Sequence, residues 1–284
     1  MARRTVLFSP GDQPDLLRKA PDSGADVVVF DLEDAVAPGE KDRARKTVRS
    51  VLGELTTECE LCVRINPLAG PGTEDLDALS ERWDAVDSVM LPKVSDPDAV
   101  GHLRDEFTER GVERPVLALL ESARGILDAD AIADERGVDA LLVGAEDLAA
   151  DIGATRTDDG EEISYARQRV VLAASAAGID AIDTLVTDFD RSTYLETESE
   201  RAVRFGFDGK MAIHPAQIPI INDAFTPSEA ELDWARRVLS AKAEADRDGR
   251  GVFAVDGEMI DAPLIAQAEQ VVERARAAGI DVTE

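Results

Sequence analysis

The sequence predicts an α/β protein, a (β/α)₈ TIM barrel followed by a C-terminal helical lid or oligomerisation arm. Short apolar runs of strand length alternate with longer amphipathic stretches of helix length, a pattern typical of a parallel sheet. The apolar runs number eight within roughly 210 residues, which favours a closed barrel over an open sheet. No Gly-x-Gly-x-x-Gly follows the first run, which argues against a dinucleotide-binding fold.

Each predicted strand is a short apolar run, and each predicted helix is a longer amphipathic stretch between two such runs. The predicted strands are residues 5–8, 27–30, 61–65, 88–91, 116–120, 140–143, 180–182 and 209–212. The predicted helices between them include residues 41–52, 73–83, 96–110, 164–177 and 192–205. These elements place the barrel domain at residues 1–223.

The last quarter of the chain, residues 224–284, does not continue the barrel repeat. A long helix is predicted at residues 228–248 and a final helix at residues 264–278. The segment between them, residues 249–263, is punctuated by glycines and is therefore expected to move. This region is predicted to be an appended lid or oligomerisation arm.

The charge balance is the most unusual bulk property, with 59 acidic and 31 basic residues and a net charge of −28. Such a surface repels nucleic acid, whose binding depends on contacts from lysine and arginine to phosphate. The acids are spread along the whole chain, which favours adaptation to high salt, where carboxylate repulsion is screened. The apolar runs are too short to span a membrane, and the first residues do not form a signal peptide, so a soluble, cytoplasmic protein is expected. Cys59 and Cys62 form a C-x-x-C without a second pair and are interpreted as two free thiols.

Barrel enzymes place their active sites at the C-terminal ends of the strands. In this sequence nearly every predicted strand ends in polar or charged residues, among them Ser9, Asp31, Glu33, Asp34, Arg64, Asn66, Lys93, Glu121, Asp147, Asp183 and His214. So many carboxylates at one end of a barrel predict a bound cation.

Glu121 and Asp147 are the strongest candidates for metal ligands. Each follows an apolar strand, and the two strands are successive, so both side chains can reach one point above the barrel. Oxygen ligands without histidine suit Mg²⁺, or Mn²⁺ as the alternative, rather than Zn²⁺. The competing interpretation is that Glu121 caps the next helix and Asp147 begins a solvated turn.

Three further strand-end residues have two interpretations each. Arg64 has the forked geometry to bind a substrate carboxylate, but it could equally form a buried ion pair with one of the neighbouring acids. Lys93 could form a Schiff base, although the acidic surroundings favour an ion pair. His214 precedes a proline and is either a turn residue or a supporting residue of the site.

Motifs along almost the whole chain resemble those of the citrate lyase beta-subunit-like proteins, in the HpcH/HpaI aldolase and malyl-CoA lyase superfamily. These motifs, in chain order, are RTVLFSPG from Arg4, DLEDAV from Asp31, VRIN from Val63, MLPK from Met90, ESARG from Glu121, GAEDL from Gly144, GFDGK from Gly206, IHP from Ile213 and GEMID from Gly257. Ser122 stands where threonine is usual in these proteins, a change that keeps the hydroxyl.

The resemblance implies Mg²⁺ on Glu121 and Asp147, and an oxo-acid held by Arg64, Glu121 and Asp34. It also implies that Asp261 is the catalytic base, delivered by a neighbouring subunit of a homotrimer or of a hexamer. The alternative for Asp261 is a helix cap before Ala262 and Pro263.

The function implied is a lyase that cleaves or forms a 3-hydroxyacyl-CoA of the malyl-CoA, citramalyl-CoA or citryl-CoA type, with an oxo-acid and acetyl-CoA as the products of cleavage. Three alternatives are a class II aldolase acting on free oxo-acids, a citrate lyase beta subunit acting on a carrier-protein thioester within a complex, and a metal-binding protein without turnover.

Overall fold

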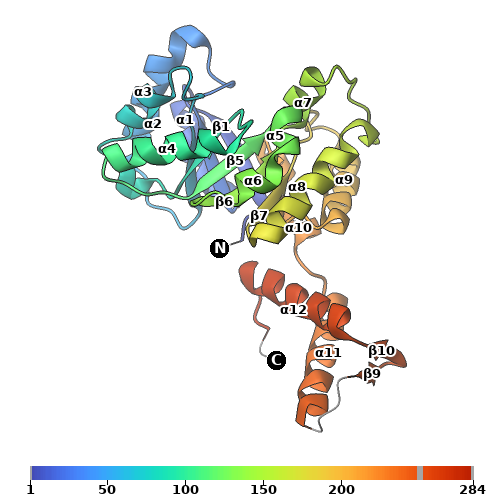
Figure 1. The fold of residues 1–284 in the computed structure, drawn as a ribbon. Helices are drawn as coiled ribbons and strands as arrows, with labels where there is room; N and C mark the ends of the chain where they lie inside the picture. The colour runs from blue at the N-terminus through green and yellow to red at the C-terminus, as the bar shows by residue number, and fades with distance from the viewer. Residues whose placement is uncertain (1, 248–251, 283–284) are drawn as a thin grey trace. The chain divides into compact units, whose positions relative to one another are not determined.

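The computed structural model describes residues 2–247 and 252–282 (Figure 1). These residues divide into two compact units. We call Arg3–Asn222 the barrel unit, and Asp223–Glu284 together with Met1–Ala2 the C-terminal unit. Helix α10 (Ile218–Phe225) contains the boundary between them.

The barrel unit contains a closed parallel barrel in which strands β1 to β8 pair in sequence order and β8 returns to β1. Its strands are β1 (Thr5–Pro10), β2 (Val27–Asp31), β3 (Glu60–Arg64), β4 (Ser88–Leu91), β5 (Val116–Leu120), β6 (Val138–Val143), β7 (Asp180–Asp183) and β8 (Gly209–Ala212). The predicted eight-stranded barrel is therefore confirmed. Val29, Met90, Leu119 and Leu142 belong to the apolar cluster inside it, because alternate residues of each strand point to opposite faces.

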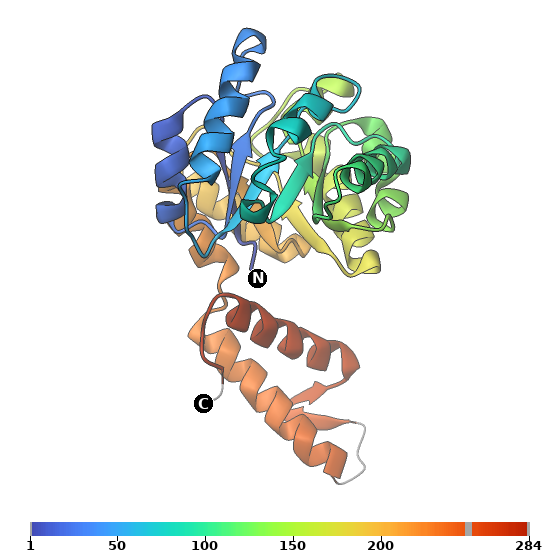
Figure 2. The ribbon, with the colours of Figure 1, turned by 90° about the vertical axis from the view of Figure 1, so that its left-hand side faces the viewer.

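Helices surround the barrel on its outer side (Figures 1 and 2). They are α1 (Pro14–Lys19), α2 (Lys41–Leu52), α3 (Gly72–Ala78), α4 (Pro97–Glu109), α5 (Ala123–Leu127), α6 (Ala129–Ala133), α7 (Ala145–Asp151), α8 (Ser164–Ala177) and α9 (Ser192–Phe205). Helix α2 shows why they form there: Ala44, Val48 and Val51 recur at helical spacing and are fully buried.

The helix predicted at residues 73–83 is shorter than expected. Helix α3 ends at Ala78, and a separate 3-10 turn begins at Trp83. The Trp83 ring packs edge-on against Phe107, with centroids 5.8 Å apart. The chain leaves the helix early because turns at residues 79–82 bring Trp83 onto α4, a tertiary contact that no glycine or proline announces.

The C-terminal unit is a pair of antiparallel helices, α11 (Glu229–Arg247) and α12 (Ala262–Ala277), with a short hairpin between them. The segment predicted as a mobile glycine-rich stretch contains β9 (Phe253–Val255) and β10 (Glu258–Ile260), and residues 248–251 lie outside the described part. Asp256 and Gly257 turn the hairpin with φ values of 53° and 85°, which matches an Asp-Gly two-residue turn. Ile260 is fully buried in the core that α11 and α12 share.

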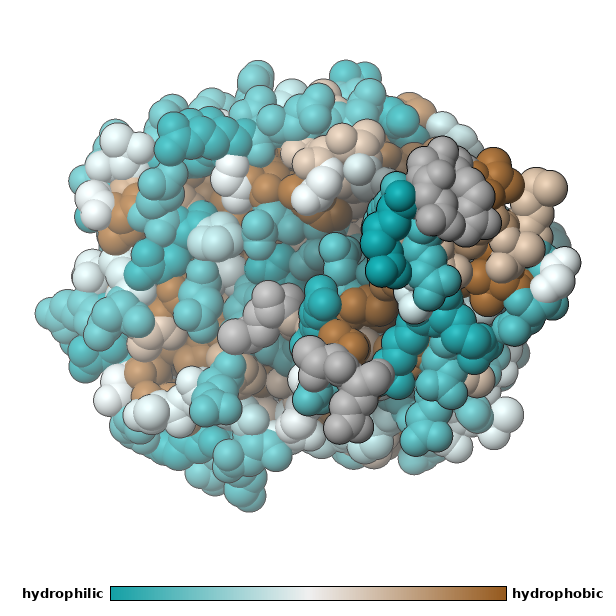
Figure 3. Space-filling view, turned by 90° about the horizontal axis from the view of Figure 1, so that it is seen from below, coloured by the Kyte–Doolittle hydropathy of each residue, from teal (hydrophilic) through white to brown (hydrophobic). Residues whose placement is uncertain are grey.

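Hydrophilic side chains cover most of the face shown in Figure 3, as expected for 59 acidic residues. Among the described residues, no helix combines the length and apolar character that crossing a membrane requires. Cys62 is a buried free thiol of β3, and Cys59 is a half-buried free thiol just before that strand.

Candidate active site

A cavity of about 330 Å³ opens at the C-terminal ends of the barrel strands. Five of the predicted strand-end residues line it, namely Asp31, Asp34, Arg64, Glu121 and Asp147. Its remaining walls are mostly apolar, formed by Phe8, Pro10, Ala35, Leu119, Gly144, Ala145, Leu185, Met211 and Ile213, together with the polar residues Glu146 and Thr184. The cavity therefore places a charged group of side chains against an apolar wall, as small-molecule sites commonly do.

Arg64, at the end of β3, is held on two sides. Its Nε and Nη2 donate to both carboxylate oxygens of Asp31 at 2.8 and 2.5 Å, and its guanidinium carbon lies 4.9 Å from the centre of the Phe8 ring. Burial opposes the charged form, but the hydrogen bonds and charge of Asp31 and the charge of Glu33 raise the pKa of Arg64 above its ordinary value. The ion pair considered from the sequence is therefore present, and Arg64 still lines the cavity.

Glu33 links Arg64 to Lys93. Its buried carboxylate lies 3.2 Å from Nη1 of Arg64 and accepts a hydrogen bond from Nζ of Lys93. Nζ of Lys93 also lies 3.5 Å from the exposed Asp34. Lys93 thus forms the ion pair that the sequence favoured over a Schiff-base role.

Glu121 directly follows β5 and is 7% exposed. Its Oε1 accepts a hydrogen bond from the backbone N–H of Lys93 at 2.7 Å, and Lys93 adopts a left-handed backbone with φ of 55°. Burial raises the pKa of Glu121 to about 7, and the charges of Asp147 and Glu33 act in the same direction. The helix that follows is capped by Ser122, whose Oγ accepts from the N–H of Gly125 at 3.2 Å, so the cap interpretation of Glu121 is wrong.

Asp147 lies in the first turn of α7, which follows β6. It is half-buried and lines the cavity, and its side chain makes no hydrogen bond or ion pair with another residue that the structure describes. Asp147 therefore lies in the first turn of a helix at the cavity, and its role as a metal ligand stays a prediction. Within residues 2–247 and 252–282, no three carboxylates, histidines or cysteines gather into a metal-binding cluster, and Glu121 and Asp147 both line the cavity.

Two predicted residues lie elsewhere. His214 caps the 3-10 turn Pro215–Gln217 through Nδ1, which accepts from the N–H of Ala216 at 3.1 Å, and its ring stacks on Phe189. Asp261 belongs to the C-terminal unit, is exposed, and caps α12 by accepting from the N–H of Leu264 at 3.5 Å. The cap considered for Asp261 is therefore present in the structure.

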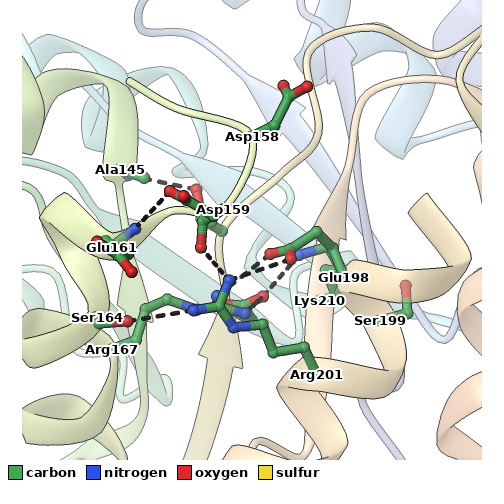
Figure 4. Close-up of polar contacts among 12 residues, drawn as sticks. Ala145, Asp158, Asp159, Glu161, Ser164, Arg167, Glu198, Ser199, Arg201 and Lys210 are labelled. Atoms are coloured by element: carbon green, nitrogen blue, oxygen red, sulfur yellow. Dashed lines mark hydrogen bonds and ion pairs between the residues drawn. The ribbon is translucent and has the colours of Figure 1, made fainter. Parts of the chain in front are cut away.

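Sequence reasoning missed the buried charge network beside the cavity. Arg167 donates to both oxygens of Asp183 at 2.9 Å, and Nζ of Lys210 donates to the same carboxylate at 2.6 Å. Arg167 and Lys210 are labelled in Figure 4. Glu198 lies 3.2 Å from Arg167 and balances the charge. Asp183 could be found as a strand-end acid, whereas Arg167 lies inside a helix and carries no comparable signal.

The chain is thus a (β/α)₈ barrel with Arg64, Glu121 and Asp147 in a cavity at the C-terminal ends of its strands, the place where barrel enzymes have their active sites. The family model described as HpcH/HpaI aldolase/citrate lyase matches residues 4–215. The chain belongs to this HpcH/HpaI aldolase/citrate lyase family, which confirms the resemblance read from its motifs and the prediction of a lyase-family enzyme.

Named relatives extend over nearly the whole chain. Citramalyl-CoA lyase, mitochondrial, from Rattus norvegicus is 36% identical, covering 95% of this chain and 85% of that protein. Citrate lyase subunit beta from Leuconostoc mesenteroides subsp. cremoris is 37% identical, covering 97% and 94%. The crystal structure of CitE from Mycobacterium tuberculosis, in complex with magnesium, acetoacetate and coenzyme A, is 38% identical with a TM-score of 0.82, covering 97% of this chain and 98% of that chain.

Proposed function

We propose that this protein is a Mg²⁺-dependent carbon–carbon lyase acting on a 3-hydroxyacyl-CoA of the malyl-CoA, citramalyl-CoA or citryl-CoA type. Cleavage gives an oxo-acid and acetyl-CoA, and the reverse reaction joins them. The observation that carries the proposal is that Glu121, Asp147 and Arg64 line one cavity in a chain of this family. The CitE structure that holds magnesium, acetoacetate and coenzyme A supports the same cofactor and substrate class.

The residues present fit Mg²⁺, or Mn²⁺ in its place. Glu121 and Asp147 supply carboxylate oxygens without histidine or cysteine, the donor set that hard divalent cations prefer. Asp147 has no other polar partner among the described residues, so its carboxylate is available. Two protein ligands leave further positions for water and substrate oxygens, as Mg²⁺ sites usually do.

In the cleavage direction Arg64 binds the substrate carboxylate through N–H groups that Asp31 does not occupy. Asp34, which is exposed and lines the same cavity, is assigned to binding the substrate next to Arg64. A bound divalent cation supplies Lewis-acid polarisation of the substrate oxygens. A base removes the hydroxyl proton, the C–C bond breaks, and the enolate of acetyl-CoA is then protonated at carbon.

We assign the base to Asp261 on the strength of the GEMID motif, with delivery by the C-terminal arm of a neighbouring subunit in a homotrimer or hexamer. Asn can cap a helix as Asp does, so Asp261→Asn should keep stability while reducing kcat by about 10²- to 10⁴-fold. Mixed oligomers of Asp261→Asn and Glu121→Gln chains should regain partial activity. Wild-type turnover in Asp261→Asn would reduce the residue to a helix cap, and mixed oligomers without activity would argue for closure within one chain.

The metal assignment is tested by removing either carboxylate. Glu121→Gln and Asp147→Asn should abolish Mg²⁺-dependent turnover and leave the fold intact by circular dichroism. Full activity in EDTA, or in either variant, would contradict the assignment. Borohydride trapping of a substrate adduct on Lys93 would instead indicate a Schiff-base aldolase.

The similarity to citrate lyase beta subunits supports one further candidate, action on a carrier-protein thioester within a complex. Turnover of CoA thioesters by the purified chain alone would argue against that candidate. Cleavage of free hydroxy-acids without a thioester would indicate a class II aldolase. A cytoplasmic location stays a prediction from the sequence.

A further inference from the structure

The N-terminus of α7 lacks a cap of its own. Its N-cap residue is Gly144, which has no side chain to accept a hydrogen bond from the first free N–H groups of the helix. Glycine is required at this position because a Cβ would lie 2.5 Å from Cβ of Glu121 and 2.8 Å from its Oε2. Because Glu121 lies so close, a residue with a capping side chain cannot occupy the position of Gly144.

Thr184, just after β7, supplies the missing acceptor. Its Oγ1 accepts a hydrogen bond from the N–H of Ala145 at 3.3 Å, and both residues are buried. Ala145 is the first residue of α7, and Asp147 follows two residues later in the same turn. Because Asp147 has no polar partner among the described residues, its position depends on the start of this helix.

The position of Thr184 is itself fixed by the contacts of the residue before it. The preceding residue, Asp183, is fully buried and binds Arg167 from α8 and Lys210 from β8. The guanidinium of Arg167 also lies 5.0 Å from the centre of the Phe205 ring. Figure 4 labels Ala145 of α7, Arg167 of α8 and Lys210 of β8 in one close-up of polar contacts.

We infer that Thr184 is a positioning residue: its hydroxyl fixes the first turn of α7 and thereby sets the separation of the Asp147 and Glu121 carboxylates. The inference rests on the proposed metal site, and it adds a residue that lines the same cavity but whose hydroxyl bonds to the backbone of α7 rather than to the carboxylate of Glu121 or Asp147. Gly144 leaves room for Glu121 but has no side chain to cap α7. The Thr184 hydroxyl, directly after β7, therefore supplies the acceptor for the first turn of that helix.

The test compares Mn²⁺ affinity by calorimetry in wild type, Thr184→Val and Thr184→Ser. Valine keeps the shape but removes the acceptor, so Mn²⁺ should bind about tenfold more weakly, the lower end of the effect of partners that orient metal ligands. Serine keeps the hydroxyl and should bind as wild type does. The KM for Mg²⁺ should rise more than kcat falls, because the lost interaction acts on the metal ligands.

Thr5→Val is the matched control. Thr5 is buried like Thr184, and its hydroxyl donates to Asn222 at 2.9 Å and accepts from the N–H of Asp26 at 3.2 Å, but it lies at the opposite end of the barrel. Thr5→Val should lose stability without losing Mn²⁺ affinity. An equal loss of affinity in Thr5→Val would overturn the positioning role.

A second readout needs no metal. Hydrogen exchange of the Ala145 amide in the metal-free protein should accelerate in Thr184→Val and not in Thr184→Ser. If the wild type binds Mn²⁺ but Thr184→Val changes neither the exchange of the Ala145 amide nor the Mn²⁺ affinity, this inference alone is overturned. A wild type that binds no Mn²⁺ would overturn the proposed metal site and the inference together. If neither Thr184→Val nor Thr184→Ala folds while Thr5→Val does, Thr184 maintains the barrel itself and the positioning role is overturned.

Discussion

Two neighbours of opposite chemistry set the orientation of Arg64. Asp31 binds one edge of the guanidinium through two hydrogen bonds, and the Phe8 ring lies against it within the barrel. An arginine held in this way has already lost its rotamer freedom, so binding a substrate carboxylate costs little additional entropy. Asp31 is therefore as important to the site as Arg64.

Arg64→Lys tests this arrangement. A single ammonium group cannot keep the two-point contact with Asp31 and also present N–H groups to the substrate. With about 1.5–3 kcal/mol for a lost charged hydrogen bond, kcat/KM for the oxo-acid should fall by about 10- to 100-fold. Steady-state kinetics with varied oxo-acid measure the change.

Arg3→Lys provides the comparison, because Arg3 forms ion pairs with Glu60 and Asp180 at the start of the strands. It should leave kcat/KM unchanged. Equal losses in Arg3→Lys and Arg64→Lys would mean that the effect is one of general stability.

Glu121 gives the metal-free protein a pH-dependent stability. Burial raises the pKa of Glu121 to about 7, above the ordinary value of 4.5. Between these pH values the folded state binds the extra proton, so the contribution of Glu121 to stability falls as pH rises from about 4.5 to about 7 and stays low above it. In EDTA at pH 8, Glu121→Gln should therefore be more stable than wild type by up to about 3 kcal/mol, at about 1.4 kcal/mol per pKa unit.

Urea unfolding at pH 8 and pH 5.5 measures this difference, which should be smaller at the lower pH. A Glu121→Gln variant that is less stable than wild type at pH 8 would show that the carboxylate is favourable in the empty site.

The strand-end rule explains why Arg64, Glu121 and Asp147 could be found from the sequence. Each follows a recognisable apolar run, and parallel strands bring such residues to one end of a barrel. The rule could not show that Ser122 rather than Glu121 caps α5, or that Gly144 and Thr184 act together. The cap is a local bond from Gly125 to Ser122, which the strand-end rule does not consider, whereas the Thr184 contact joins residues 39 positions apart in the chain.

At the scale of the elements, β7 and β8 are joined by charge as well as by backbone pairing. Asp183 of β7 binds Lys210 of β8 and Arg167 of α8, and all three side chains are fully buried. The pKa of Asp183 lies below its ordinary value, because the charges of Lys210 and Arg167 outweigh the opposing effect of burial. The group is nearly balanced in charge once Glu198 is counted.

Asp183→Asn should therefore be strongly destabilising, by about 3–5 kcal/mol, because it leaves two buried cations without their shared partner. Asp158→Asn is the matched control. Asp158 binds Arg191 through two contacts of 2.9 Å, the geometry of Arg167 with Asp183, but at the surface. Urea midpoints should fall sharply for Asp183→Asn and hardly change for Asp158→Asn. Similar midpoints for the two variants would contradict the importance of burial.

The order of strands and helices could be predicted from periodicity, while some boundaries could not. Helix α3 ends early so that Trp83 can reach Phe107, which lies in the next helix. The hairpin of β9 and β10 was missed although Asp256 and Gly257 are a strong turn signal between apolar residues. The nearby glycines favour a mobile segment when only composition is considered.

At the scale of the whole molecule, the excess of acidic residues dominates the electrostatics. The net charge is −28, so carboxylates repel one another across the surface at low ionic strength. Surface ion pairs such as Arg18 with Glu54 are also weakened by salt, but exposed pairs contribute little. The relief of repulsion is therefore expected to exceed the loss of these pairs.

Thermal unfolding in increasing KCl tests that balance. The midpoint should rise between dilute buffer and molar KCl, where the Debye length is about 3 Å. Sucrose, which does not screen charge, provides a control for stabilisation by solute exclusion. A midpoint that falls steadily as KCl increases would contradict adaptation to high salt.

The central claim is that the cavity holding Glu121, Asp147 and Arg64 cleaves a C–C bond of a CoA thioester. The most direct measurement incubates the purified chain in molar KCl with Mg²⁺ and, separately, malyl-CoA, methylmalyl-CoA, citramalyl-CoA and citryl-CoA, and identifies the products by mass spectrometry. We expect an oxo-acid and an acyl-CoA from at least one of them, with activity lost in EDTA and restored by added Mg²⁺. Cleavage that persists in EDTA, or release of free CoA with no oxo-acid from every thioester, would contradict the account.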